Sequence, residues 1–218
     1  MGKIIAIDGP AGSGKGTVAK ILADRLNLTY IDTGAMYRSI AYLALKNNID
    51  ITDQDKIVEI AKSAKIKFIE GKTYLNGIDV SKEIRSMEVT RVVSPISSIV
   101  KLREILVDMQ REMGNNAGIN GVIMEGRDIT TVVFPNANYK FYLDASLEER
   151  AKRRYKENIE KGIKTTYEDV LDNIKKRDYN DMHKEVGSLT CTKDSMYIDS
   201  TNLTIEEVVE TIQNAIEV

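Results

Sequence analysis

Five short segments of the chain are mostly apolar, and each of them ends in an acidic residue. Their apolar positions are continuous instead of alternating, which is typical of strands covered by helices on both faces. We therefore predict a parallel sheet made of residues 3–8, 29–32, 121–125, 140–144 and 195–199. The terminal acids would gather at the carboxyl edge of this sheet, which is where open α/β folds bind ligands.

Helical stretches lie between these segments. Two of them begin with capping-box spacing, Ser146 with Glu149 and Thr204 with Glu207. The helices are expected at residues 15–26, 34–48, 146–161 and 204–218. The predicted fold class is therefore α/β, a five-stranded parallel sheet flanked by helices.

One segment departs from this alternation of strand and helix. Residues 66–80, "IKFIEGKTYLNGIDV", hold two β-rich pieces joined at "EGK", followed by Asn-Gly, a strong tight-turn signal. We predict a small antiparallel β insert there. With 218 residues, three prolines and no obvious linker, the chain is expected to form one folding unit.

Charge and cysteine content exclude several classes of protein. The chain has 31 basic and 33 acidic residues, so general attraction to nucleic acid or to a membrane is not expected. A single cysteine, Cys191, suits a reducing compartment, and the first apolar run is too short for a signal or a membrane span. We expect a soluble, cytoplasmic monomer.

The stretch "GPAGSGKGT" follows the first strand and opens a helix, which is the setting of a phosphate-binding P-loop. Its backbone N–H groups would surround phosphates, and Lys15 would reach the β- and γ-phosphates. Gly16 stands where such loops carry the Ser or Thr that binds Mg²⁺, and Thr17 comes one residue late. We therefore expect Mg²⁺ to be held chiefly by phosphates and water, without a protein ligand. The alternative is a simple glycine-rich turn.

Charged side chains follow two other predicted strands. Arg38 lies in the first turns of a helix and could hold an acceptor phosphate, or it could be a surface arginine. Arg127 and Asp128 could form a structural ion pair or contact a ligand. An aspartate suits the N4 amino group of cytosine, whereas the uracil carbonyl would leave Asp128 unpaired and repelled.

The helix beginning near residue 146 carries further arginines. Arg150 and Arg154 are spaced i, i+4 and so share a helix face, with Arg153 alongside. They could be a solvated face, or a mobile lid could use them to close over phosphates.

The segments "IDGPAGSGKGT", "IDTGAMYR", "EGRDITTVVFP", "RDYND" and "IDST" occur in this order from residue 4 to about 201 and resemble bacterial cytidylate kinases. Adenylate kinases share the loop but not the "GRD" stretch or the insert. The resemblance implies transfer of the γ-phosphoryl group of ATP to CMP and dCMP, with Mg²⁺, giving ADP and CDP or dCDP. It also implies a core at about 1–32, 118–150 and 185–218, an acceptor-binding region at 33–117 and a lid at 151–184.

The resemblance also assigns roles to residues. Phosphate transfer would fall to Lys15, Arg127, Arg150, Arg154 and Arg177. ATP would be bound by Gly9, Pro10, Ala11, Gly12, Ser13, Gly14, Lys15, Gly16, Thr17 and Arg153. CMP would be bound by Thr33, Tyr37, Arg38, Ser94, Arg103, Arg127, Asp128, Arg177, Asp181 and Lys184. The family has arginine at the position of Lys184, and lysine keeps the charge but loses the planar fork.

The acceptor is itself a phosphate oxygen, largely dianionic near neutral pH because its second pKa is about 6. Direct in-line transfer therefore needs no protein general base, and we interpret His183 as an ordinary helix residue. Two other functions stay open. One is a P-loop kinase for another acceptor, such as AMP, UMP or a sugar acid. The other is a nucleotide-dependent switch, which the absence of D-x-x-G and N-K-x-D disfavours.

Overall fold

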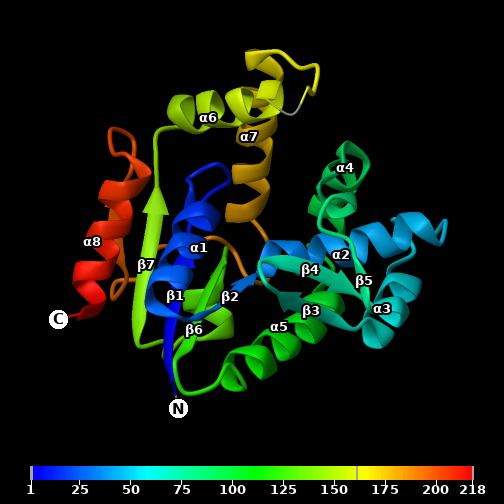
Figure 1. The fold of residues 1–218 in the computed structure, drawn as a ribbon. Coiled ribbons are helices and arrows are strands. Elements are labelled where there is room, and N and C mark those ends of the chain that lie inside the picture. The colour runs from blue at the N-terminus through cyan, green and yellow to red at the C-terminus, as the bar shows by residue number, and fades with distance from the viewer. Residues whose placement is uncertain (1, 161, 218) are drawn as a thin grey trace.

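The computed structural model describes residues 2–160 and 162–217. Its main sheet has the strand order β2-β6-β1-β7-β8, and every neighbouring pair is parallel. The strands are β1 (Lys3–Asp8), β2 (Thr29–Asp32), β6 (Gly121–Gly126), β7 (Tyr139–Asp144) and β8 (Met196–Asp199). The predicted fold class is confirmed, and each predicted strand is present within one residue at either end (Figure 1).

The predicted helices correspond to α1 (Lys15–Leu26), α2 (Thr33–Lys46), α6 (Leu147–Glu160) and α8 (Ile205–Glu217). The predicted ends at 161 and 218 lie outside the described residues. Thr204 and Glu207 form a complete capping box, because each accepts a hydrogen bond from the backbone of the other. Ser146 accepts from the Glu149 N–H, but the Glu149 carboxylate turns to Arg153 instead.

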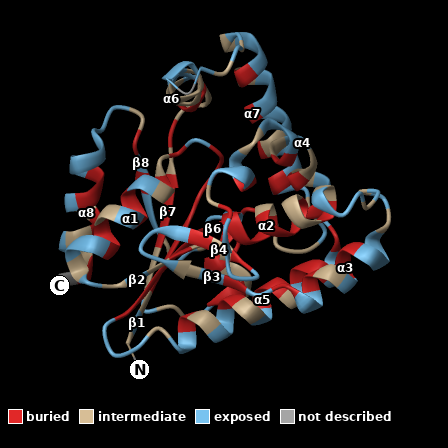
Figure 2. Cartoon of the chain, turned by 45° about the vertical axis from the view of Figure 1, so that its right-hand side comes forward, coloured by how far each residue is buried: buried red, intermediate tan, exposed pale blue. Residues whose placement is uncertain are grey.

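Four helices and two short turns were not predicted. They are α3 (Gln54–Ser63), η1 (Glu83–Arg85), α4 (Met87–Ile96), α5 (Val100–Asn115), η2 (Ile129–Val133) and α7 (Tyr167–Met182). Helices α2 to α5 bury a common core that packs beside the insert (Figure 2). Helices α6 and α7 form a separate unit above the carboxyl edge of the sheet, joined by a small cluster of Ala151, Val170 and Ile174.

Alternate residues of the central strands face two different cores. Ile5, Ile7 and Ile123 pack with α1 and α8 on one side of the sheet. Ala6 and Met124 pack with α5 and η2 on the other side. Because both faces are buried, the strands read as continuous apolar runs.

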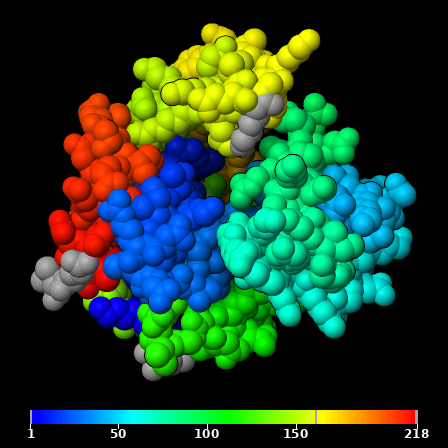
Figure 3. All heavy atoms as spheres, in the orientation of Figure 1, coloured from blue at the N-terminus to red at the C-terminus, as the bar shows by residue number. Residues whose placement is uncertain are grey.

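The insert is a three-stranded antiparallel sheet made of β3 (Ile66–Ile69), β4 (Lys72–Leu75) and β5 (Ile78–Asp79). Asn76 and Gly77 both have positive φ, at 51° and 83°, which is the type I′ geometry expected of an Asn-Gly turn. The other turn, at Gly71, comes close to Lys20 of α1. The insert therefore lies beside α1. Figure 3 shows the cyan atoms of the insert next to the blue atoms of α1.

Candidate active site

A cavity of about 1420 Å³ opens at the carboxyl edge of the sheet, between the loop after β1, the insert and the α6–α7 unit. The space-filling view shows the hollow beneath the α6–α7 unit (Figure 3). Its walls carry most of the residues assigned from the sequence. Lining residues among them are Ala11, Gly12, Gly14, Lys15, Gly16, Thr17, Thr33, Tyr37, Arg38, Arg103, Arg127, Asp128, Arg153, Arg154, Arg177, Asp181 and Lys184.

The loop after β1 leads directly into the N-terminus of α1. Gly14 caps this helix with φ at 91°, a conformation that favours glycine, and no side chain satisfies the first N–H groups of the helix. Uncapped N–H groups and the helix dipole attract an anion. Gly9, Pro10 and Ser13 do not line the cavity, although the Pro10 carbonyl oxygen accepts a hydrogen bond from Lys15 Nζ at 3.1 Å.

Glu125, at the end of β6, was recognised from the sequence only as a strand-end acid. In the structure a Cβ added to Gly16 would lie 3.2 Å from Glu125 Oε1 and 3.6 Å from the Tyr30 hydroxyl. The Glu125 carboxylate thus lies beside the position where other P-loops carry Ser or Thr. A larger residue at position 16 would require the Glu125 carboxylate to move by a few tenths of an ångström.

Lys15 and Glu125 are nearly buried, and their charged atoms are 3.9 Å apart. Burial lowers the pKa of Lys15 to about 8, with the charge of Arg127 adding to the effect. Burial likewise raises the pKa of Glu125 to about 7, and the nearby Asp32 carboxylate adds to the rise. Neither charge is well solvated in this structure, so a phosphate beside Lys15 would be strongly attracted.

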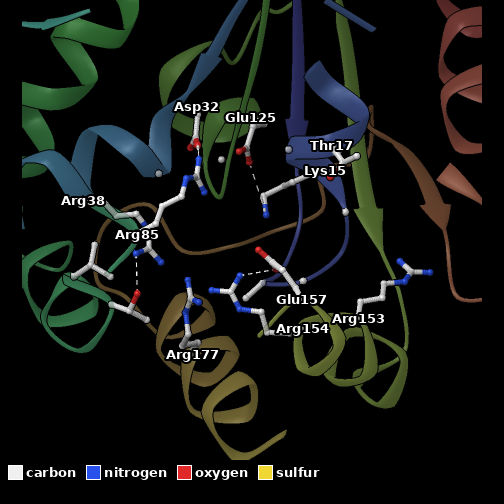
Figure 4. Close-up of a pocket in the computed structure, with 18 of the residues that line it drawn as sticks. Lys15, Thr17, Asp32, Arg38, Arg85, Glu125, Arg153, Arg154, Glu157 and Arg177 are labelled. Carbon is white, nitrogen blue, oxygen red and sulfur yellow. Dashed lines mark hydrogen bonds and ion pairs between the residues drawn. The ribbon is translucent and has the colours of Figure 1, made fainter. Parts of the chain in front are cut away.

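Among the described residues, seven arginines line the same cavity, and four of them, Arg38, Arg127, Arg154 and Arg177, influence one another electrostatically. Burial lowers the pKa of Arg38 to about 10, and the charges of Arg177 and Arg154 contribute. Burial also lowers the pKa of Arg177 to about 10, with Arg127 next in importance. Figure 4 shows Arg38, Arg154 and Arg177 around one space opposite Lys15. Cations held this close repel one another, so the site is electrostatically built for a polyanion.

Asp181 lies between two cations of the cavity wall, Arg127 and Lys184. It accepts hydrogen bonds from Arg127 Nε at 2.8 Å and from Lys184 Nζ at 2.9 Å. Burial alone would raise the pKa of Asp181, but Arg127 and Lys184 hold it well below its usual range. Lys184 also donates to the Ser97 hydroxyl at 3.1 Å. A lysine here thus reaches two partners without the fork of an arginine.

Asp128 is paired with Arg103, and the alternative pairing with Arg127 is wrong. Arg103 Nη2 donates to Asp128 Oδ2 at 2.5 Å, and side-chain exposure is 5% and 7%. Arg103 also donates to the Ser97 carbonyl and lies over the Tyr37 ring, 5.4 Å from its centre. The pair borders the cavity, so a planar ring placed there would meet a fixed carboxylate.

Arg150 and Ser94 lie outside the cavity lining, contrary to the expectation from the sequence. Arg150 Nη1 donates to Asp178 Oδ2 at 2.6 Å and to the Ala11 carbonyl at 3.1 Å. Arg150 therefore connects the phosphate loop to α7, whereas Arg154, one turn later, faces the cavity and pairs with Glu157. Ser94 instead accepts a long hydrogen bond from Asn180.

Replacement of Arg150 by methionine should lower the free energy of unfolding by about 3–5 kcal/mol, because Asp178 would keep a buried charge without its partner. The matched change Arg154→Met removes a partly exposed ion pair and should cost less than about 1 kcal/mol. Urea unfolding of the two variants measures the difference. Equal losses would mean that Arg150 has no structural role.

The roles of two further acidic residues near the cavity were not predicted from the sequence. Asp32 caps α2 and forms a 3.0 Å ion pair with Arg85 of η1, which connects the turn after the insert to the sheet edge. Asp8, the last residue of β1, is fully buried and accepts three hydrogen bonds from residues 129 and 130. Their common signal is an acid at the end of a predicted strand.

A parallel sheet, an uncapped phosphate loop with its lysine and a ring of arginines define a P-loop kinase, an enzyme that transfers a phosphoryl group between nucleotides or to another acceptor. Among residues 2–160 and 162–217, no helix is long and apolar enough to cross a bilayer.

Comparisons with known proteins identify the family. The cytidylate kinase family matches residues 5–218, and the chain belongs to it. It is 51% identical to the cytidylate kinase of Enterococcus faecalis, over 100% of this chain and 97% of that protein. It is 46% identical to the cytidylate kinase of Bacillus subtilis, over 98% and 96%. The chain is thus a nucleoside monophosphate kinase.

A solved structure supports the fold independently. An uncharacterised protein from Eubacterium ventriosum superimposes with a TM-score of 0.55 at 14% identity, covering 99% of this chain and 98% of that chain. At this identity the likeness concerns the architecture alone.

Proposed function

We propose that the protein transfers the γ-phosphoryl group of ATP to CMP or dCMP, giving ADP and CDP or dCDP. The observation that carries the proposal is the arrangement around one cavity of a phosphate loop, a cationic wall and a fixed carboxylate. The relatives named cytidylate kinase support CMP as the acceptor.

In this proposal ATP lies on the phosphate loop. Its phosphates bind the N–H groups at the start of α1 and Lys15, and its nucleoside extends toward Arg153, Leu203 and Ile205, which line the cavity beyond Gly14. These side chains offer an apolar surface and a planar cation, both suited to a purine ring.

The acceptor nucleotide would occupy the opposite half of the cavity. Its phosphate meets Arg38, Arg127 and Arg177. Its base meets the Arg103–Asp128 pair, where the carboxylate can accept from the cytosine amino group. Asp181 bonds to Arg127 on the phosphate side, and Lys184 bonds to Ser97 on the base side. We therefore expect Asp181 and Lys184 to contact the sugar of the acceptor nucleotide.

Mg²⁺ fits the donor atoms of this edge. Glu125 and Asp32 are oxygen donors beside the loop, and Thr17 adds a hydroxyl, although no cluster of three acidic or other metal-binding side chains occurs within 2–160 and 162–217. The ion would depend mainly on phosphates and water, with these carboxylates near its water shell, and would neutralise charge on the transferred group.

The residues contribute position and charge in place of a general base. The arginines hold two mutually repelling anions in line, and Lys15 offsets charge that develops during transfer. His183 does not line the cavity; its ring stacks on Tyr179, and its Nδ1 lies 2.7 Å from the Tyr179 carbonyl oxygen. His183 is the C-cap residue of α7, directly after its last helical residue, so this geometry supports a structural position at the helix end and no catalytic role.

Charge balance and one exposed free thiol, Cys191, support action in a reducing compartment such as the cytoplasm. A monomer stays the prediction for the oligomeric state, and gel filtration tests it.

The test is ADP release from ATP and Mg²⁺ with CMP, dCMP, UMP, AMP or GMP supplied separately, against a control without acceptor. We expect strong stimulation by CMP and dCMP and little by the others. Preference for another nucleotide would overturn the role of Asp128 in base recognition. Hydrolysis that no acceptor stimulates would overturn the kinase proposal itself.

A further inference from the structure

Asp128 stands at the N-cap position of the turn η2, but its side chain does not cap that turn. An aspartate in this position usually accepts a hydrogen bond from one of the next backbone N–H groups. Here the Asp128 carboxylate points to Arg103 instead. The N–H groups at the start of η2 must therefore be satisfied from elsewhere, because the segment is buried.

Asp8 supplies the missing cap from the neighbouring strand. Its Oδ1 accepts from the Ile129 N–H at 2.9 Å. Its Oδ2 accepts from the Thr130 N–H at 2.8 Å and from the Thr130 hydroxyl at 2.7 Å. The carboxylate is fully buried, and the hydrogen bonds occupy both of its oxygens.

The exchange of roles has a direct consequence for Asp128. The Thr130 N–H is two residues after Asp128, and it is one of the two donors that an N-cap carboxylate normally takes. While Asp8 holds the N–H groups of residues 129 and 130, Asp128 gains less by turning back toward η2 than it does from its bond to Arg103.

We propose that Asp8 is a positioning residue for base recognition, which caps η2 in place of Asp128 and so leaves the Asp128 carboxylate in the cavity beside Arg103. The inference rests on the proposed function for its consequence in substrate choice. Asp8 also precedes Gly9, the first residue of the phosphate loop. The Asp8 carboxylate itself contacts only the start of η2, so its effect is expected on the acceptor side.

The first test is kinetic and uses Asp8→Asn, which keeps the shape but turns one acceptor into a donor facing N–H groups. We expect kcat/KM for CMP to fall about 100-fold, because a misplaced contact costs that order. The ratio of CMP to UMP utilisation should fall with it, while KM for ATP changes little. Thr130→Ala, which keeps both backbone hydrogen bonds to Asp8, should leave the ratio nearly unchanged.

A double-mutant cycle separates positioning from a general loss of structure. If Asp8 acts through Asp128, then Asp8→Asn should add little to the loss already caused by Asp128→Asn. Multiplicative losses would overturn the proposal, as would an unchanged CMP to UMP ratio in the single variant. Ile212→Val, a core change in α8, serves as a control that lowers stability without touching the site.

The second test is structural and does not depend on the substrate. A crystal structure of Asp8→Asn without nucleotide should show the Asp128 carboxylate turned toward the N–H groups of residues 129 and 130. An intact Arg103–Asp128 pair would overturn the proposal. If Asp8→Asn does not fold, Asp8→Ser, which keeps one acceptor and leaves room for water, allows the same comparison. Should the wild type not use CMP, the proposed function fails, and this structure still decides the role of Asp8.

Discussion

Replacement of Lys15 by methionine is expected to lower kcat by about 10³-fold while leaving the protein folded. Lys15 is the cation at the start of α1, nearly buried beside the loop, and its charge offsets charge on the phosphates during transfer. Methionine fills a similar volume without the charge. Steady-state kinetics with saturating ATP and CMP measure the loss, and Lys62→Met, an exposed lysine of α3, is the matched control.

The same substitution should not reduce stability. Because burial lowers the pKa of Lys15 in the folded protein, the charged lysine is less favourable there than in the unfolded chain. In the wild type, the unfolded state binds the extra proton between pH of about 8 and the ordinary lysine pKa, so stability gains with rising pH in that window. The methionine variant should lose this dependence and be as stable as the wild type at neutral pH. A large loss of stability would mean that Lys15 is structural.

The pH dependence of catalysis should run the other way. In the free enzyme kcat/KM for ATP should fall above pH of about 8, where Lys15 loses the proton that attracts phosphate. Bound phosphates stabilise the charged form, so kcat should persist to higher pH. Identical upper limits for the two parameters would contradict this assignment.

Sequence patterns predicted the main sheet because its strands are buried on both faces, and such burial leaves continuous apolar runs that are easy to recognise. The helices α3, α4, α5 and α7 were not predicted. The apolar faces of α3, α4 and α5 pack on one another, on α2 and on the insert, whereas α7 packs on α6. The hydrophobic pattern alone did not show where each of these helices begins. The turn at Asn76-Gly77 was predicted correctly, because few residue types other than Asn and Gly tolerate two successive positive φ angles.

The site was predicted unevenly for a related reason. Motifs place residues that act from one local segment, such as Lys15 in its loop. Pairings between distant segments leave no such signal: Arg127 joins Asp181 across 54 residues, and the partner of Asp128 comes from α5. Helical spacing correctly predicted that Arg150 and Arg154 share a helix face. The two arginines have different neighbours, however, so Arg150 is buried and Arg154 borders the cavity.

Replacement of Asp128 by asparagine is expected to lower kcat/KM for CMP by about 10³-fold or more and to change the preferred base. The amide is the same size as the carboxylate but offers a donor where cytosine presents its amino group, so a required hydrogen bond becomes a repulsion. Uracil presents a carbonyl at that position, which the amide can satisfy. The ratio of UMP to CMP utilisation should therefore rise, and KM for ATP should stay close to the wild-type value.

Stability must be followed in the same variant, because Arg103 keeps a buried charge whose partner has become neutral. Asp178→Asn is the matched control: it neutralises a carboxylate that is as buried and as closely paired, with Arg150, but lies outside the cavity. Both variants should lose stability, and only Asp128→Asn should change the base preference. Alanine at position 128 should weaken CMP use far more than ATP binding. If CMP and ATP suffer equally, or if the Asp178 variant shifts the preference as well, Asp128 is a structural partner of Arg103 and does not read the base.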